Sequence, residues 1–342
     1  MSVSEQIVMA HGSGSTMMRE LIDEYFLSVY GSAELAQGND SACLKLATPT
    51  TELAFTTDSY VVTPLFFAGG DIGRLAVSGT VNDLATSGAT PLYLSLAFIM
   101  EEGLPLSELR LICQSIAQTA AEAQVSIVTG DTKVVPRGKG DKVYINTAGI
   151  GVFLSQRPLS GANCQPGDKI LLSGTLGDHG ITIVSARENL NFSTNIVSDV
   201  APLNHLVAKV LQAAPATRCF RDPTRGGLAA TINELAAQSA TSMTIEESLV
   251  PVNPAVQGAA EMLGYDIYQI ANEGKMVAIV PAEQATAALA AMRTDEHGKN
   301  AAIIGEVSGP PASGLPAAWV RTPFGSTRVL DMLVGEQLPR IC

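Results

Sequence analysis

The chain has 342 residues, of which 46% are hydrophobic and 16% are charged, and its formal net charge is −12. This length is sufficient for two ordinary domains with a large core. The negative charge argues against a nucleic-acid partner, because the phosphates would be repelled. Any phosphate site must then be local, built from backbone N–H groups, a few cations and bound metal.

The five cysteines are spread through the chain and are odd in number, with no C-x-x-C pair. This pattern is typical of a reducing compartment and argues against a disulfide framework. The N-terminus has no basic region followed by an apolar core, so no signal peptide is predicted. No stretch approaches the length of a membrane span. We therefore expect a cytoplasmic protein with no membrane partner.

The first half of the chain predicts an α+β layer with its helices on one face. Residues 1–40 form a polar entry segment with one amphipathic helix, at 16–29. The domain at 41–154 then has the order ββαβαββ. Its strands are expected at 43–46, 52–57, 92–100, 126–129 and 143–152, and its helices at 72–86 and 106–123. Asp71 is placed to cap the helix that follows it.

The second half predicts a separate α/β domain. The Pro- and Gly-containing segment 155–167 is the expected linker, the domain spans 168–325, and residues 326–342 form the tail. Helices are predicted at 180–187, 203–213, 227–239, 254–263 and 282–293, and strands at 169–172, 242–246, 266–271, 276–280 and 303–307. The strands at 266–271 and 276–280 flank a tight turn at 272–274.

Four aspartates next to small residues are candidates for a metal site: Asp58, Asp83, Asp131 and Asp222. Asp58 and Asp131 follow apolar strands, where an α/β layer presents side chains to a ligand crevice. Asp83 lies inside an apolar helix, where a carboxylate needs a partner. Carboxylates that converge need a cation, and Mg²⁺ commonly bridges such groups to nucleotide phosphates. The alternative is that each aspartate only caps a turn or helix.

Three further segments suit phosphate. Lys133 follows Gly130-Asp131-Thr132 and can hold a phosphate as a point charge. The segment Gly12-Ser13-Gly14 is flexible and rich in donors, although such runs are usually plain loops. Arg225 precedes two glycines that open a helix, whose N-terminal N–H groups favour an anion.

For two residues, the sequence leaves open whether the role is chemical or only structural. Glu273 is either part of a hairpin turn or a general base at the rim of a crevice. Cys342 ends the chain after Pro339, so its thiol is either a chance exposed cysteine or the tip of a mobile arm. The adjacent terminal carboxylate raises the thiol pKa, so a partner would have to activate this group.

Taken in order, several motifs resemble the HypE family of hydrogenase maturation factors, the carbamoyl dehydratases. The resemblance runs nearly end to end, and the ordered set with its tail is highly specific. It rests on HGSG at 11–14, FTTDSYV at 55–61, PLFF at 64–67, ND at 82–83, EEGLP at 101–105, VTGDTKVV at 128–135, GTLGDHG at 174–180, RDPTRGG at 221–227, ANEGK at 271–275 and PRIC at 339–342. The family's first loop usually has glycine where this chain has Ser15, which makes that loop's role less secure.

This resemblance implies a two-domain fold like aminoimidazole ribonucleotide synthetase, which dimerises through its N-terminal domains with ATP beside the interface. Cys342 would receive a carbamoyl group from HypF, and ATP would drive its dehydration to a thiocyanate. The cyanide would pass to iron on the HypC–HypD scaffold, for a nickel–iron hydrogenase.

The resemblance also assigns roles to the candidate residues. Asp58, Asp83 and Asp131 would orient Mg²⁺ and phosphate. Lys133, with Thr132 beside it, and the loop Gly12-Ser13-Gly14 would hold the terminal phosphate. Asp222 and Arg225 would face the nucleotide from the second domain. Glu273, slightly preferred, or Asp83 would remove the amide protons.

Two rival hypotheses follow from the same residues. One is a small-molecule kinase or synthetase of the same fold, which would not need Cys342. The other is a thiol carrier that shuttles a group while a different protein does the chemistry. The sequence does not indicate whether the tail enters its own cleft or that of a neighbouring subunit.

Overall fold

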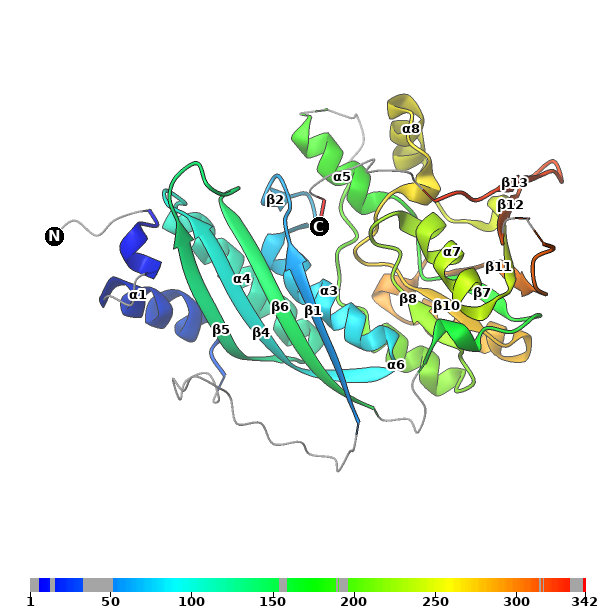
Figure 1. Cartoon of the computed structure of the whole chain (residues 1–342), viewed down its shortest axis with the longest axis horizontal. Helices are drawn as coiled ribbons and strands as arrows, with labels where there is room; N and C mark the ends of the chain where they lie inside the picture. Colours follow the sequence, from blue (N-terminus) through cyan, green and yellow to red (C-terminus); the bar gives the residue numbers. More distant parts are fainter. Residues whose placement is uncertain are drawn as a thin grey trace.

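Two domains lie side by side in the molecule, and the last residues of the chain lie between them (Figure 1). The computed structural model describes residues 6–12, 16–32, 52–153, 159–188, 190, 196–313, 315, 317–332 and 341–342. Across these ranges, none of the helices combines the length and the apolar character that crossing a bilayer requires.

The N-terminal domain is built on a four-stranded sheet of order β1-β6-β4-β5. The strands are β1 (Leu53–Tyr60), β4 (Ala89–Glu101), β5 (Ser126–Val135) and β6 (Val143–Phe153). Strands β4 and β5 run parallel, whereas β1, β6 and β4 pair antiparallel. Side chains along β1 and β6 alternate between buried and accessible, as expected for a sheet with one covered face. The predicted mixed sheet is confirmed.

Helices α3 (Ile72–Thr86) and α4 (Leu106–Ala123) cover one face of this sheet (Figure 1). The Asp71 side chain accepts hydrogen bonds from the N–H groups of Gly73 and Arg74, as the predicted cap requires. Just before α3, β2 (Phe66–Phe67) pairs with β3 (Gly70–Asp71). Among the described residues, no helix covers the other face of the sheet, whose apolar side chains include Phe55, which is 71% exposed.

The N-terminal segment packs beside β5 and α4. It contains η1 (Met9–Gly12), α1 (Thr16–Leu21), η2 (Ile22–Leu27) and α2 (Ser28–Tyr30), so the helix predicted at 16–29 is present with a π-helical middle. Phe26 stacks on Phe98 of β4, with ring centroids 5.3 Å apart, which anchors the segment. The strand predicted at 43–46 lies outside the described residues.

The C-terminal domain has a seven-stranded sheet of order β13-β12-β9-β11-β7-β10-β8. Its strands are β7 (Lys169–Leu172), β8 (Cys219–Arg221), β9 (Ser242–Glu246), β10 (Val277–Val280), β11 (Ala302–Ser308), β12 (Ala318–Arg321) and β13 (Thr327–Val329). Its helices are α5 (Asp178–Arg187), α6 (Asn204–Ala213), α7 (Gly227–Ser239), α8 (Pro254–Leu263) and α9 (Ala285–Arg293). Helices α7 and α8 share one apolar cluster and α6 and α9 another, and the wholly apolar β10 is buried throughout.

Short 3-10 helices connect these elements: η4 (Gly161–Asn163), η5 (Glu247–Leu249), η6 (Ile267–Gln269), η7 (Ala282–Gln284) and η8 (Glu296–Gly298). Of the expected linker 155–167, the described part contains η4, which packs against α7.

The strand predicted at 266–271 is wrong. Asp266 accepts a hydrogen bond from the Tyr268 N–H and starts η6 instead. Strand β10 pairs with β7 and β8, so neither of its edges is free for a hairpin partner. The predicted tail, 326–342, also starts too early in the sequence, because residues 327–329 form β13 and belong to the sheet.

The two domains share their interface through α3. Asn82 is buried, its Oδ1 accepts the Leu203 N–H at 2.7 Å, and its Nδ2 donates to the Ala201 carbonyl at 3.1 Å. Val200, Ala271 and Ile341 pack into the same apolar cluster as the N-terminal domain core. These contacts hold the segment 198–203 of the second domain against α3 of the first domain.

Candidate active site

A cavity of about 290 Å³ lies between the two domains. Strand β1, helix α3, the β8–α7 loop, the segment around Glu273 and the chain end all contribute to it. Its titratable lining residues are Asp58, Tyr60, Asp83, Arg221, Asp222, Arg225, Glu234, Glu273 and Cys342. The structure thus brings together half of the predicted site residues: Asp58, Asp83, Asp222, Arg225, Glu273 and Cys342.

Asp83 extends from the last turn of α3, and the partner that a carboxylate in this helix was predicted to need is present. The Thr56 hydroxyl donates to Asp83 Oδ2 at 2.8 Å. Burial raises the pKa of Asp83 to about 7, and the nearby carboxylates of Asp222 and Asp58 add to the effect. A carboxyl with this pKa is poised for a cation or for proton exchange near neutral pH.

Asp58 lies within β1 and not at its end, and it shares the covered face with Tyr60. The Tyr60 hydroxyl donates to Asp58 Oδ2 at 3.1 Å. Gly79 of α3 leaves room for this hydroxyl, since a Cβ there would lie 2.2 Å from the tyrosine oxygen. Glycine in mid-helix is otherwise unfavourable, so its use here is tied to the site.

Asp222 and Arg225 enter the cavity from the loop that follows β8. Burial raises the pKa of Asp222, and Arg221 and Arg225 oppose that rise. Gly226 and Gly227, with φ of 76° and 59°, make the sharp turn into α7. A Cβ on Gly227 would lie 2.6 Å from the Ile270 carbonyl oxygen, so this turn packs directly under the segment that carries Glu273.

Glu273 is buried and lines the cavity, and no strand directly precedes it in the described segment 196–313, so the prediction of a hairpin turn at this residue is wrong. Its N–H donates to Asp199 Oδ1 at 3.2 Å. Gly274 allows the close approach of the two segments, because a Cβ there would lie 1.7 Å from the Asp199 carbonyl oxygen. Burial raises the pKa of Glu273 well above its ordinary value, and the Asp222 and Asp199 carboxylates contribute.

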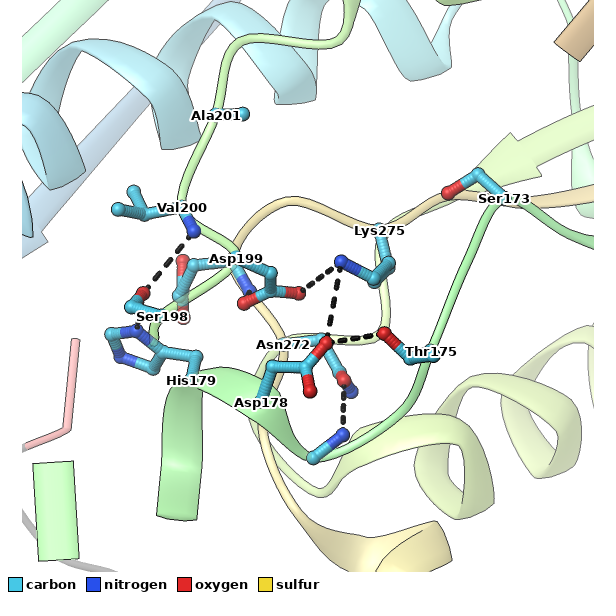
Figure 2. A network of polar contacts seen from close by, with 12 residues as sticks. Ser173, Thr175, Asp178, His179, Ser198, Asp199, Val200, Ala201, Asn272 and Lys275 are labelled. Carbon is cyan, nitrogen blue, oxygen red and sulfur yellow. Dashed lines mark hydrogen bonds and ion pairs between the residues drawn. The ribbon is translucent and has the colours of Figure 1, made fainter. Parts of the chain in front are cut away.

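A buried polar network, drawn in Figure 2, supports this segment from behind. Lys275 Nζ lies 3.1 Å from Asp199 Oδ2 and 3.8 Å from Asp178 Oδ2. Asn272 Oδ1 accepts the Gly177 N–H at 2.7 Å, which ties the segment to the start of α5. One ammonium therefore compensates two carboxylates beside the active cavity.

Cys342 lies in the cavity of its own chain, which the Glu273 carboxyl also lines. Burial raises the thiol pKa far above its ordinary value, and the Glu273 charge adds to this. The docked thiol is therefore un-ionised and a weak nucleophile.

Asp131 and Lys133 do not join this site within one chain. Their side chains are exposed on the open face of the sheet, where they pair with each other at 3.1 Å. Thr132 between them is buried and points to the other face. Neighbouring residues Ser59, Asn146, Ala97 and Asp131 form one row across the sheet, so three strand spacings, roughly 14 Å, separate β1 from β5.

Gly12 ends η1, which packs on the β5 side of the sheet. It is therefore also remote from Asp58 of the same chain. Ser13, Gly14 and Ser15 lie outside the described residues.

A larger cavity of about 790 Å³ lies behind the network and is lined by Arg74, Lys275 and His297 among others. Its charged groups largely pair with each other, as Arg74 does with Glu122 at 2.8 Å. The chemically organised cavity is the smaller one, because it gathers four of the predicted acidic residues and a thiol.

The two domains match two domain families in sequence. Residues 38–153 match the AIR synthase related protein, N-terminal domain, and residues 165–316 match its C-terminal domain. The carbamoyl dehydratase HypE of Cupriavidus necator is 51% identical over 339 residues, which are 99% of this chain and 95% of that protein. The chain belongs to the HypE family of carbamoyl dehydratases.

Solved HypE structures agree with this identification. A HypE crystal structure in complex with ATP superposes with a TM-score of 0.93 at 47% identity, covering 98% of this chain and 99% of that one. A HypE–HypF complex gives a TM-score of 0.79 at 45% identity, covering 92% and 99%. Membership of the HypE family makes the chain an enzyme of hydrogenase maturation, and it favours the dehydratase over the kinase and carrier hypotheses.

Sequence reasoning missed several residues that organise the HypE cavity. Asn82 and Asn272 directly precede Asp83 and Glu273 in the sequence. Their position beside a predicted site residue was the signal that could have identified them. Asp199 lies in an irregular segment with no periodicity, so nothing in the sequence marked it. Tyr60 lies two residues after Asp58 on the same face of β1, which strand alternation could have indicated.

Proposed function

We propose that this chain converts an S-carboxamide on Cys342 into a thiocyanate inside its own cavity, with ATP as the second substrate. The observation that carries the proposal is the meeting of three groups in one cavity: the Cys342 thiol, the Glu273 carboxyl and the Asp83 carboxyl. The thiocyanate would supply the cyanide ligand of the active-site iron of a nickel–iron hydrogenase.

The net reaction balances as carboxamide plus ATP giving thiocyanate, ADP and phosphate. The γ-phosphoryl group passes to the amide oxygen, which turns a poor leaving group into phosphate. Both N–H protons must then leave as the C≡N bond forms. Glu273 is the base that faces the sulfur-bound carbon, and its raised pKa makes its carboxylate a stronger base.

Mg²⁺ fits the carboxylates that the cavity gathers. Asp58 and Asp222 both raise the pKa of Asp83, so the cluster repels itself without a cation. Hard oxygen ligands of this kind suit Mg²⁺, which would neutralise charge on the ATP phosphates. Asp58 and Asp83 would hold the ion, and Arg225 would face the phosphates from the second domain.

A second copy of the chain would complete the site. Asp131 and Lys133 lie on the open face of the sheet, with the exposed apolar side chain of Phe55 on the same face. Pairing of two such faces would bury the apolar side chains and bring Asp131 and Lys133 of one copy to the other copy's cavity. The loop at 12–14 would close over the same ATP.

Mixing two inactive variants tests this arrangement. Glu273→Gln and Lys133→Ala leave each homodimer without a complete cavity. After unfolding and refolding together in equal amounts, half of the dimers would be mixed, each with one intact cavity. Recovery of about a quarter of wild-type turnover is expected, and no recovery would contradict the shared site.

The partners follow from the chemistry and from the relatives. A HypE crystallised with HypF supports HypF as the donor of the carbamoyl group, and HypC–HypD would accept the cyanide. We place the chain in the cytoplasm, where thiols stay reduced.

Intact-protein mass tests the central reaction. The full chain and a Cys342→Ala variant are incubated with HypF, carbamoyl phosphate, ATP and Mg²⁺. Gain of a carbamoyl group followed by loss of one water, only in the chain with Cys342, is the expected result. Carbamoylation without water loss would leave a carrier, and ATP hydrolysis without modification would point to a kinase.

A further inference from the structure

His179, near the start of α5, lies fully buried between the chain end and the segment 198–201 (Figure 2). Its Nε2 lies 2.8 Å from the carbonyl oxygen of Ile341, and its Nδ1 lies 2.8 Å from Ser198 Oγ. The sequence alone left open whether this histidine caps a helix or contacts a ligand. Within the part of the chain that the structure describes, His179 provides the side-chain hydrogen bond to the backbone at Ile341.

The hydrogen-bond partners determine the tautomer of the ring. A carbonyl oxygen can only accept, so Nε2 must carry the proton and donate to Ile341. Burial lowers the pKa of His179, which keeps the ring neutral and leaves Nδ1 as an acceptor. The Ser198 hydroxyl therefore donates to Nδ1, while Ser198 Oγ accepts the Val200 N–H at 3.2 Å.

Packing holds the ring in this orientation. The Phe67 ring meets it edge-on, with centroids 5.5 Å apart and an interplanar angle of 84°. The Ile341 side chain, 5% exposed, packs into the apolar cluster that contains Phe67 and Val200. The tail is thus held at Ile341 by one backbone hydrogen bond and one apolar contact, just before the reactive thiol.

The same short segment also holds the base. Ser198 orients His179, and the next residue, Asp199, accepts the Glu273 N–H. Adjacent residues therefore set the position of the tail and the position of the group that faces its sulfur. A displacement of either would change the geometry between Cys342 and Glu273 directly.

We propose that His179 is a positioning residue that docks the C-terminal arm by donating to the Ile341 carbonyl, with Ser198 fixing the ring for that role. This inference rests on the proposed dehydration at Cys342, but its first test needs neither ATP nor the carbamoyl group.

Alkylation of Cys342 by iodoacetamide reports how often the arm leaves the cavity. The rate is followed on the C-terminal peptide by mass spectrometry, in the full chain without nucleotide. His179→Leu keeps the bulk of the ring and removes the donor, and we expect about a tenfold faster alkylation, the effect of losing one buried hydrogen bond. His179→Gln retains an N–H donor and should restore a rate near that of the wild type.

His205→Leu is the matched control. Its Nε2 also donates to a backbone carbonyl, that of Glu122 at 2.9 Å, but it lies outside the cavity. Alkylation of Cys342 should be unchanged in this variant. An unchanged rate in folded His179→Leu would overturn the proposal. If that variant fails to fold, Ser198→Ala decides, with a several-fold faster rate expected and an unchanged rate overturning the proposal.

Single-turnover dehydration of the carbamoylated chain separates positioning from general damage. His179→Leu should lower the rate constant about tenfold while leaving the KM for ATP unchanged. A raised KM with an unchanged rate constant would contradict a role in positioning the tail. The two proposals can fail separately. If His179→Leu is alkylated faster but the carbamoylated wild type loses no water, the proposed function is contradicted and the docking role of His179 is supported.

Discussion

Two groups of buried carboxylates lie on either side of the segment around Glu273, and they differ in how their charge is compensated. In the cavity, the carboxylates of Asp58 and Asp222 add to the raised pKa values of Asp83 and Glu273. In the network of Figure 2, Asp178 and Asp199 share the ammonium group of Lys275.

This difference distinguishes the reactive cavity from the network of Asp178, Asp199 and Lys275, which we call the frame because it holds the backbone beside the cavity. A carboxylate pair with its own lysine is complete and can serve only to hold the backbone in place. A cluster in which some carboxylates raise the pKa values of others requires a ligand cation or a proton, which is the property of a catalytic centre. The following predictions test this division, from the largest expected effect to the smallest.

Glu273→Gln should lower dehydration of the carbamoylated chain by about a thousandfold, because an amide cannot accept the N–H protons. Stability should change little or rise, since the substitution removes a buried charge from a repelling cluster. Single-turnover mass spectrometry and thermal unfolding measure the two effects. Glu306→Gln, on the far sheet and paired with Lys169, is the control, and retention of activity in Glu273→Gln would transfer the role of the base to Asp83.

Lys275→Met should destabilise the chain by about 3–5 kcal/mol, because it leaves two buried carboxylates without their cation. Urea unfolding measures the change. Lys169→Met removes an exposed partner of Glu306 and should cost less than about 1 kcal/mol. Equal effects of the two substitutions would mean that the network does not act as a frame.

Asp178 gives the frame a pH dependence. Burial raises its pKa to about 6, with Lys275 opposing and Asp199 adding to the rise. The folded chain therefore holds this proton more tightly than the unfolded chain does, and stability falls as pH rises from about 4 to about 6. A pKa difference of about 2 units corresponds to about 3 kcal/mol.

Asp178→Asn lacks this titration, so the stability of the wild type relative to the variant should fall by about 2 kcal/mol between pH 4 and 6.5. Urea unfolding at both pH values checks the expectation. Parallel stability curves for the two proteins would show that Asp178 is already ionised at the lower pH.

Asp131→Asn should change the stability of the folded chain by less than about 1 kcal/mol, because its pair with Lys133 is exposed to solvent. Turnover should nevertheless fall steeply, since we place this side chain against the ATP of a second copy. Thermal unfolding and dehydration assays on the same sample compare the two. Full activity in this variant would remove Asp131 from the site.

The sequence carried the fold and half of the site for identifiable reasons. Asp83 in an apolar helix and Asp58 beside small residues are both unusual enough to signal chemistry, and both lie in the cavity. The apolar runs of β7 and β10 and the cap at Asp71 are local signals, so the elements they mark are present.

The rest of the site depends on which strands pair and which face of the sheet each side chain occupies. A single sequence does not contain this information. Asp131 and Lys133 flank the buried Thr132, so alternation indicates that they share a face, but it cannot say which face Asp58 occupies. Glu273 was expected in a hairpin because apolar residues flank it on both sides. The pairing of β10 with β7 and β8 excludes that hairpin, and this pairing is a property of the assembled sheet.

Gly274 has a consequence for genetics. It makes no side-chain contact and touches no substrate, yet any Cβ at this position would overlap the carbonyl of Asp199. A saturation library at this codon should therefore return glycine alone under selection for hydrogenase activity. In genome surveys, a copy that keeps every acidic residue and the terminal cysteine but has lost this glycine should be classed as a decayed gene.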